Sequence, residues 1–208
     1  MNNTWRDRAV QFDHLYTGEA FECNIPYFGT YLRSKLNQRL ENALRFVDFI
    51  HAQKIIDLGC GTGTFAVKAA LKGVEVHGYD ISGKAIKIAA LKAEKAGISD
   101  LCFFYEADIT TVDFPDVDAW FDLGCLQYLP DISSVINKAS TARDFYSCLA
   151  MKYHWLNVIR FFYRRVLKGN PYYTYTKKEI QGLFSLYTNV HVERDGPQFC
   201  VSSVQFKV

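Results

Sequence analysis

Apolar positions along the chain fall into two alternating patterns, short continuous runs and longer stretches with helical spacing. The short runs predict buried strands near residues 54–59, 74–80, 102–107, 117–123 and 145–152. Between the first two strands the spacing predicts a helix at about 62–72. Between the second and third it predicts a helix that Ser82 caps and Gly97 closes. Strands that alternate with crossover helices favour an α/β fold with a doubly wound, mainly parallel sheet.

The last part of the chain adds helices and a hairpin. One helix is expected at 131–142, and another begins at Thr176, which forms a capping box with Glu179. The strand-like runs 190–193 and 199–206 are joined by an Asp-Gly-Pro segment, which predicts a hairpin. The sheet is therefore expected to end with an antiparallel strand.

The stretch 155–168 has two distinct helical faces. Apolar residues recur on one face: Trp155, Val158, Ile159, Phe162 and Val166. Arg160, Arg164 and Lys168 recur every fourth residue on another face. We predict an amphipathic helix that covers the sheet with its apolar stripe and leaves its basic face in water. The alternative is contact with an anionic acceptor or a membrane surface.

The first 51 residues predict an N-terminal helical cap, with helices at 5–16 and 30–50. A chain of 208 residues suits a single domain, so residues 52–208 are expected to form its cofactor-binding α/β core. The sequence shows no apolar signal segment and no membrane-spanning run, and its six scattered cysteines lack the spacing of a zinc site. These features predict a cytoplasmic protein without a metal.

Charge does not point to a macromolecular partner. The chain has 24 Lys and Arg residues against 22 Asp and Glu residues, which leaves a formal net charge of +2. No global field of that size favours nucleic acid or an acidic membrane. We therefore expect a small-molecule acceptor, no nucleic acid and no membrane span, whereas the oligomeric state cannot be predicted.

A glycine-rich turn follows the first predicted strand. Asp57 leads into Gly59, Gly61 and Gly63, which let the backbone turn sharply and approach a ligand closely. Thr64 stands where a dinucleotide fingerprint needs glycine, and the Gly-Lys-Ser/Thr of a P-loop is absent from the sequence. The turn therefore predicts a small-molecule cofactor site of another kind, the alternative being a merely flexible strand-to-helix loop.

Two further aspartates end the next predicted strands. Asp80 ends the second strand, where a carboxylate can accept two hydrogen bonds from a ribose diol. Asp108 ends the third strand and could accept from an exocyclic amine, with Ile81 and Ile109 as apolar walls for a flat base. Each aspartate alone could equally be a helix cap or turn residue, but all three together with the glycine turn favour a nucleoside site.

At these residues the chain resembles the class I S-adenosylmethionine-dependent methyltransferases. The resemblance rests on the segment 57–63, on Asp80 and Asp108, and on the fourth-strand segment 117–130, and it covers about residues 50–208. It implies S-adenosyl-L-methionine as the cofactor and a seven-stranded sheet. It also implies cofactor contacts from Asp57, Gly59, Gly61, Gly63, Asp122 and Cys125 at the methionine end, Asp80 at the ribose, and Ile81, Asp108 and Ile109 at the adenine. Tyr16 could close over the adenosyl group as a lid.

Methyl transfer from a sulfonium is an in-line displacement, so orientation in a dry pocket can supply about 7–11 kcal/mol of the barrier. A general base is optional. His154 and Tyr128 follow the fifth and fourth strands and are the catalytic candidates, although a histidine at a strand end is more often structural.

The expected function is methylation of a small, apolar or aromatic acceptor at an oxygen, nitrogen or sulfur atom. One alternative is a catalytically silent protein of the same fold that binds the cofactor or a partner. Another is a macromolecular methyltransferase, which the near-neutral charge and the missing N/D-P-P-Y/F tetrapeptide disfavour.

Overall fold

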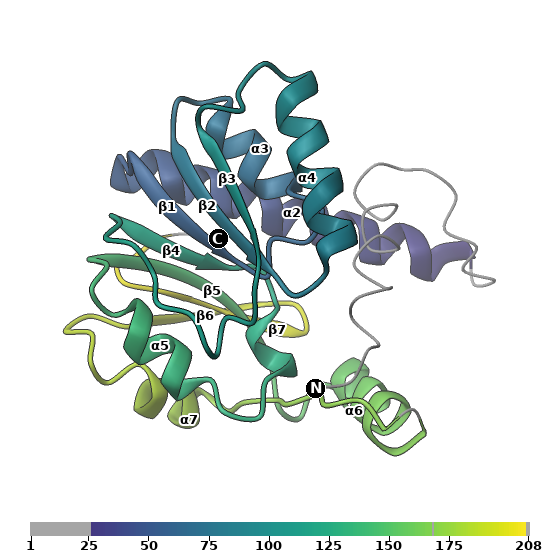
Figure 1. Cartoon of the computed structure of the whole chain (residues 1–208). Helices are drawn as coiled ribbons and strands as arrows, with labels where there is room; N and C mark the ends of the chain where they lie inside the picture. The colour runs from purple at the N-terminus through teal and green to yellow at the C-terminus, as the bar shows by residue number, and fades with distance from the viewer. Residues whose placement is uncertain (1–25, 168, 207–208) are drawn as a thin grey trace.

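The computed structural model describes residues 26–167 and 169–206, in which one seven-stranded sheet carries helices on both faces (Figure 1). Its strand order is β3-β2-β1-β4-β5-β7-β6. The strands are β1 Lys54–Leu58, β2 Glu75–Asp80, β3 Cys102–Glu106, β4 Ala119–Asp122, β5 Asp144–Ala150, β6 His191–Asp195 and β7 Gln198–Ser202. The first five strands pair in parallel, and β7 runs antiparallel to both β5 and β6. The predicted fold class and the antiparallel terminal strand are confirmed.

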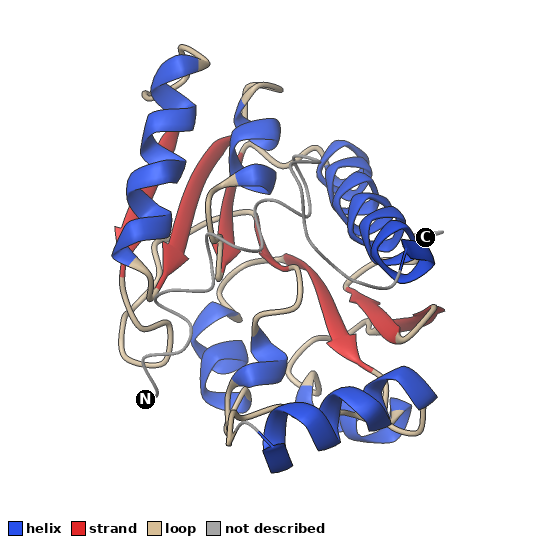
Figure 2. Ribbon diagram, turned by 90° about the vertical axis from the view of Figure 1, so that its right-hand side faces the viewer, coloured by secondary structure: helices blue, strands red, loops and turns tan. Residues whose placement is uncertain are grey.

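Alternation along the strands builds a separate apolar core on each face of the sheet. Ile55, Phe121 and Tyr146 point to the face covered by α2 (Pro26–Ile50), α3 (Thr64–Ala70) and α4 (Gly83–Lys95). Their neighbours Ile56, Trp120 and Phe145 point to the opposite face, covered by α5 (Ser133–Ala139) and α7 (Lys177–Leu183). Figure 2 shows blue helices on both sides of the red strands. Side chains of adjacent strand residues thus serve different cores, because the side-chain period of a strand is two.

Helix boundaries follow the predicted capping chemistry. Ser82 precedes α4 and accepts a hydrogen bond from the Ala85 backbone N–H, and Gly97 follows the helix at a φ of +70°. Thr176 and Glu179 form the predicted capping box at the start of α7. The helix predicted at 131–142 is present but shorter, as α5.

The prediction that the 155–168 stretch covers the sheet is wrong. It forms α6 (Trp155–Phe161) and a π-helical turn, η2 (Phe162–Leu167), and the five residues of its apolar stripe are all exposed. Figure 1 shows α6 set off from the sheet. Hydrogen bonds of a buried polar residue on the opposite side of α6, Asn157, fix this orientation.

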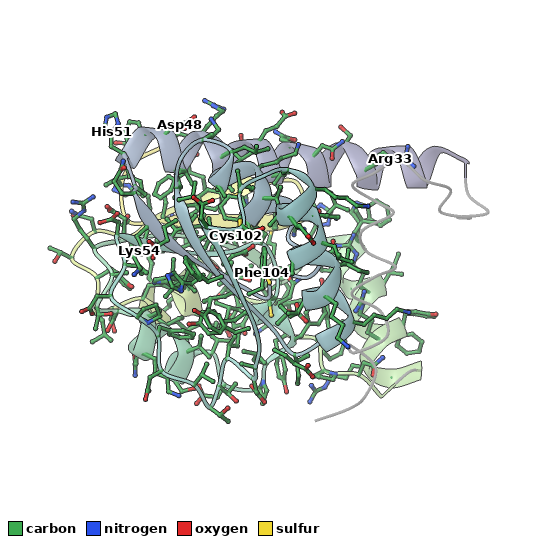
Figure 3. All side chains as sticks on the ribbon, turned by 45° about the horizontal axis from the view of Figure 1, so that its top comes forward. Arg33, Asp48, His51, Lys54, Cys102 and Phe104 are labelled. Carbon is green, nitrogen blue, oxygen red and sulfur yellow. The ribbon has the colours of Figure 1, made fainter. Side chains whose placement is uncertain are left out.

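Helix α2 begins at Pro26, four positions before the predicted start at residue 30, and its second half belongs to the core. Leu40 and Phe46 are buried there, and the Phe46 ring contacts those of Phe121 and Tyr146. Figure 3 labels Arg33 and Asp48 toward opposite ends of this helix. The helix predicted at 5–16 lies outside the described residues. Among the described helices, none has the length and apolar character needed to cross a membrane.

Candidate functional site

The strand order brings the carboxyl ends of β2, β1 and β4 side by side. Between β1 and β4 the order of the strands reverses, which is the place where open α/β sheets bind ligands. The loops that follow β1 and β4 touch there. A Cβ built on Gly59 would lie only 2.4 Å from the Cβ of Cys125, so the backbone at 59 must be glycine for these loops to meet.

The glycine turn is fixed by hydrogen bonds to β2. The backbone N–H groups of Gly59 and Cys60 donate to the Tyr79 carbonyl at 2.8 and 3.0 Å, and that of Gly61 donates to Asp80 Oδ2 at 2.9 Å. Gly59, Gly61 and Gly63 have φ values of +71°, +54° and +75°. This left-handed conformation favours glycine and explains the spacing found in the sequence.

Three carboxyl groups lie together beneath this turn. Asp57 and Asp122 are buried, and Asp80 lies at the edge of the site. Burial, followed by the charges of Asp80 and Asp122, raises the pKa of Asp57 to about 8. Burial also raises the pKa values of Asp80 and Asp122. Within residues 26–167 and 169–206, none of the three carboxyl groups has an ion-pair partner, so together they suit a cationic ligand.

Asp80 and Asp122 differ in how far the protein already satisfies them. Asp80 accepts one backbone hydrogen bond at each oxygen, from Gly61 and from Ser82 at 2.8 Å, which leaves lone pairs for a ligand. Asp122 accepts three backbone N–H groups at Oδ1, from residues 124 to 126, and the Ser147 hydroxyl at Oδ2. Asp122 therefore shapes the loop after β4.

The predicted adenine-side residues lie next along the sheet, after β2 and β3. Asp108 Oδ1 accepts from the backbone N–H and the hydroxyl of Thr110, at 3.0 and 2.7 Å. Ile81 is half-buried, whereas Ile109 is buried and joins the core cluster that contains Tyr79. The structure thus brings Ile81, Asp108 and Ile109 to the same edge as Asp80.

An aromatic cluster borders the other side, near the ends of β4 and β5. The Arg164 guanidinium lies 5.1 Å from the ring centroid of Tyr128 and 5.9 Å from that of Tyr172. The backbone of Tyr175 pairs with the end of β5, through its N–H to the Ala150 carbonyl at 2.8 Å. Burial and then the charge of Asp122 raise the pKa of Tyr175.

The two catalytic candidates have structural partners. His154 caps α6, where its Nδ1 accepts the Leu156 N–H at 3.3 Å, and burial lowers its pKa. Tyr128 lies in the short helix η1 (Leu126–Tyr128), beneath Arg164. Tyr16, the predicted lid, lies outside the described residues.

Sequence reasoning assigned no site role to Ser147 or Arg164. Ser147 lies in the middle of β5 and acts by holding Asp122, a pairing across 25 residues that no local pattern indicates. Arg164 was read as part of a solvated basic face, yet it packs on tyrosines at the edge of the site.

A family model described as "Methyltransferase domain" matches residues 51–190. The chain belongs to this methyltransferase family. Its membership confirms the resemblance to class I S-adenosylmethionine-dependent methyltransferases that the glycine turn and the strand-end aspartates indicated.

Among curated relatives, a ubiquinone biosynthesis O-methyltransferase from Chromobacterium violaceum is 34% identical over 107 residues, which is 48% of this chain and 46% of the relative. An rRNA (uracil-C5)-methyltransferase from Nitrosospira multiformis is 29% identical over 102 residues, 47% of this chain and 23% of the relative. This chain thus spans less than half the length of these relatives.

The fold resembles that of magnesium protoporphyrin IX methyltransferase from Synechocystis PCC 6803, solved with bound S-adenosylhomocysteine. The TM-score is 0.75 at 16% identity, and the similarity covers 96% of this chain and 95% of the other. At that identity the similarity supports the fold alone.

Proposed function

We propose that this methyltransferase transfers the methyl group of S-adenosylmethionine to a small apolar or aromatic acceptor. The observation that carries the cofactor assignment is the group of three carboxyls beneath the glycine turn, which has no cation of its own among the described residues. The ligand that such a site favours has a cationic end next to a neutral nucleoside. S-adenosylmethionine has an ammonium and a sulfonium at one end and a ribose and adenine at the other.

The residues present fit this cofactor in order along the sheet. Asp57 and the turn at Gly59 and Gly61 are suited to the methionine amino group, because the carboxylate is buried and the two glycines carry no side chain that would keep a ligand from the backbone. Asp80 retains lone pairs for the ribose hydroxyls. Asp108, with Ile81 and Ile109, would hold the adenine. When bound, the cofactor supplies an electrophilic methyl group on sulfur.

Asp122 and Cys125, the two remaining predicted contacts, are expected to shape the site at its methionine end. Asp122 has its oxygens occupied by the chain, so its expected part is to hold the loop that carries Cys125 beside Gly59. Cys125 would then line the methionine end with a thiol whose pKa burial raises, which keeps it neutral. Tyr16 remains the proposed lid.

The aromatic cluster supports an apolar or aromatic acceptor. Tyr128 and Tyr175 lie beyond the ends of β4 and β5 and are only partly buried, so their rings offer apolar surface there, whereas Tyr172 is buried against Tyr128 and Arg164 stacks on both rings. Relatives named for ubiquinone biosynthesis and for magnesium protoporphyrin IX agree with a small-molecule acceptor.

We assign the main catalytic task to orientation. His154 Nδ1 already accepts a hydrogen bond as a helix cap, so a proton-accepting role would require it to leave that partner. Arg164 stacks on the ring of Tyr128, so the tyrosine hydroxyl oxygen remains the second candidate. His154→Asn would separate the roles, because asparagine is a favoured helix N-cap and is not a base at neutral pH. Methyl transfer retained in His154→Asn but lost in His154→Ala would identify a structural role.

Transfer of labelled methyl groups tests the acceptor class. The protein is incubated with S-adenosylmethionine labelled in the methyl group and with a cell extract separated into small molecules, RNA and protein. We expect label in the organic-soluble small-molecule fraction, and none with Asp80→Ala. The matched control is Asp116→Ala, which removes an exposed carboxylate. Label confined to RNA would support the chemistry suggested by the rRNA methyltransferase relative and overturn the small-molecule proposal.

A further inference from the structure

Exposed apolar side chains are concentrated on one helix. Among the described residues 14 large hydrophobic side chains are exposed, and eight of them lie between residues 153 and 166. Trp155 is 64% exposed and Phe162 56% exposed. We call this surface the α6 face; it consists of Tyr153, Trp155, Val158, Ile159, Phe161, Phe162, Tyr163 and Val166. Soluble monomers rarely leave so large an apolar group together at the surface without a binding role.

Polar contacts on the inner side of α6 hold this face outward. Asn157 is 1% exposed, and its amide donates to the backbone carbonyls of Met151, at 2.8 Å, and Pro197. Its Oδ1 accepts the Tyr172 hydroxyl at 2.9 Å. Turning the helix to bury its apolar stripe would break all three hydrogen bonds in a buried place, where each lost partner is costly.

Two arginines add to this polar inner side. Arg164 packs over the rings of Tyr128 and Tyr172, and the charge of Arg160 opposes the rise that burial causes in the pKa of Tyr172. A helix that covers a core has its apolar side inward, whereas α6 has asparagine and arginine inward. The outward apolar face is therefore built into the fold by specific contacts.

The charge of the surrounding segment is strongly one-sided. No aspartate or glutamate occurs between Asp144 and Glu179, although the whole chain is nearly balanced at a net charge of +2. The same segment contains seven basic residues: Lys152, Arg160, Arg164, Arg165, Lys168, Lys177 and Lys178. Arg160 and Arg164 lie on the inner side of α6 and Lys152 pairs with Glu179, so the other four carry the excess positive charge. An anionic surface complements such a segment, because each lysine or arginine near it adds electrostatic attraction.

We propose that the α6 face binds the interface of a membrane that contains anionic lipids. Tryptophan, tyrosine and phenylalanine beside basic residues are the composition of helices that lie in the headgroup region. In Figure 1 α6 stands off from the body of the protein, an arrangement suited to a flat surface. The charge pattern selects a lipid surface over a second copy of the chain, whose identical basic segment would repel it. This inference does not depend on which acceptor is methylated.

Vesicle co-sedimentation of the 208-residue chain tests the proposal. One set of vesicles contains phosphatidylcholine only, and the other contains phosphatidylcholine with about one third phosphatidylglycerol. We expect binding to the anionic vesicles to be about tenfold tighter or more. Raising the salt to about 1 M, where the screening length is about 3 Å, should weaken it.

The test variant is Trp155→Gln/Phe162→Gln, which makes two exposed positions polar and should leave the fold unchanged. It should bind anionic vesicles about tenfold more weakly or worse. The matched control is Leu71→Gln/Leu186→Gln, at positions 59% and 61% exposed on other elements, and it should bind as the wild type does. Binding of S-adenosylhomocysteine and the melting temperature serve as folding checks for both.

Tryptophan emission gives a second readout. The chain has three tryptophans, of which Trp155 is exposed, Trp120 is fully buried and Trp5 lies outside the described residues. A blue shift on addition of anionic vesicles should disappear in Trp155→Phe and persist in Trp5→Phe, which assigns it to residue 155. Equal vesicle binding by wild type and test variant would overturn the proposal. Two other results would also overturn it, because each would give the α6 face another occupant. One is a dimer that sedimentation analysis finds in the wild type but not in the test variant. The other is vesicle binding that appears only after residues 1–25 are removed.

Discussion

Cofactor binding should depend on pH through Asp57. Burial and then the carboxyls of Asp80 and Asp122 raise the pKa of Asp57 to about 8 in the ligand-free protein, from an ordinary value of 3.8. Most of the protein is therefore protonated at this residue at neutral pH. A ligand with an ammonium group interacts better with the carboxylate, so binding must be accompanied by loss of the Asp57 proton.

The size of the effect follows from this pKa. With a value of about 8, roughly one molecule in ten is ionised at Asp57 at pH 7 and roughly one in a hundred at pH 6. The apparent affinity should therefore rise about tenfold from pH 6 to 7 and about fivefold from pH 7 to 8. At pH 7 binding should release about 0.9 proton from this residue.

Calorimetric titration with S-adenosylhomocysteine measures both quantities. This ligand carries the same ammonium group, and titrations at pH 7 in two buffers of different ionisation enthalpy give the number of protons released. Asp57→Asn removes the titrating group, so its affinity should change much less between pH 6 and 8. The largest difference from wild type is expected at pH 8. Asp116→Asn, the same change at an exposed position, should retain the wild-type profile.

A flat wild-type affinity between pH 6 and 8 would refute this reasoning. So would equal proton release by wild type and Asp57→Asn, because the proton would then come from elsewhere. The ligand-free protein gives an independent check of the sign. Its folded state holds a proton at Asp57 that the unfolded state loses above about pH 4. The free energy of unfolding should therefore fall between about pH 4 and 8, by up to about 1.4 kcal/mol per pH unit. This fall should be smaller in Asp57→Asn.

Three further outcomes are expected. Gly59→Ala should lower the melting temperature and abolish cofactor binding, because its Cβ would lie 2.4 Å from Cys125 in the loop after β4. In Gly61→Ala the new Cβ would have no atom within 4 Å, so calorimetry should show a loss of only about 1–2 kcal/mol in the free energy of unfolding. Asn157→Ala should lower the free energy of unfolding, measured by urea denaturation, by about 1–3 kcal/mol. Val158→Ala, at an exposed position of the same helix, should change it by no more than about 0.5 kcal/mol. Equal losses in the two variants would contradict the orientation of α6. Hydrogen bonds from Thr176, at the start of α7, lower the pKa of Glu179 to about 2. Ionised Glu179 should therefore add about 0.5–1 kcal/mol to the free energy of unfolding above about pH 4.5, and this gain should be lost as the pH falls toward 2. In Glu179→Ala, the free energy of unfolding measured against pH should lack that loss.

The meeting of the glycine turn and the strand-end aspartates at one edge of the sheet could be predicted because its signals are local. Gly59, Gly61 and Gly63 are required by backbone angles within one turn, and Asp80 follows directly from the end of an apolar strand. Parallel strands end at the same edge, so residues read separately from each strand meet without further information. The same local character explains why the capping box at Thr176 was predicted correctly.

The orientation of α6 could not be predicted, because it depends on partners distant in sequence. The spacing of Trp155 and Phe162 shows that an apolar stripe exists, but it does not show whether that stripe meets the core. Asn157 decides the matter through Pro197 and Tyr172, 40 and 15 residues away. A buried asparagine outweighs the stripe here because its lost hydrogen bonds would be costly, whereas exposed apolar groups lose only their burial energy.

Asp57 and Asp122 show how two buried carboxylates in one site come to differ in role. Four hydrogen bonds from the chain hold Asp122, three from backbone N–H groups and one from Ser147, and they oppose the effect of burial on its pKa. Asp57 receives no such donor from the described residues, and the charges of its neighbours add to the effect of burial. A carboxyl that the fold satisfies stabilises a loop. A carboxyl without such donors, beside two other carboxyls, lowers the stability of the protein when it ionises. A cationic ligand would remove that cost. Asp57 rather than Asp122 should therefore couple ligand binding to pH.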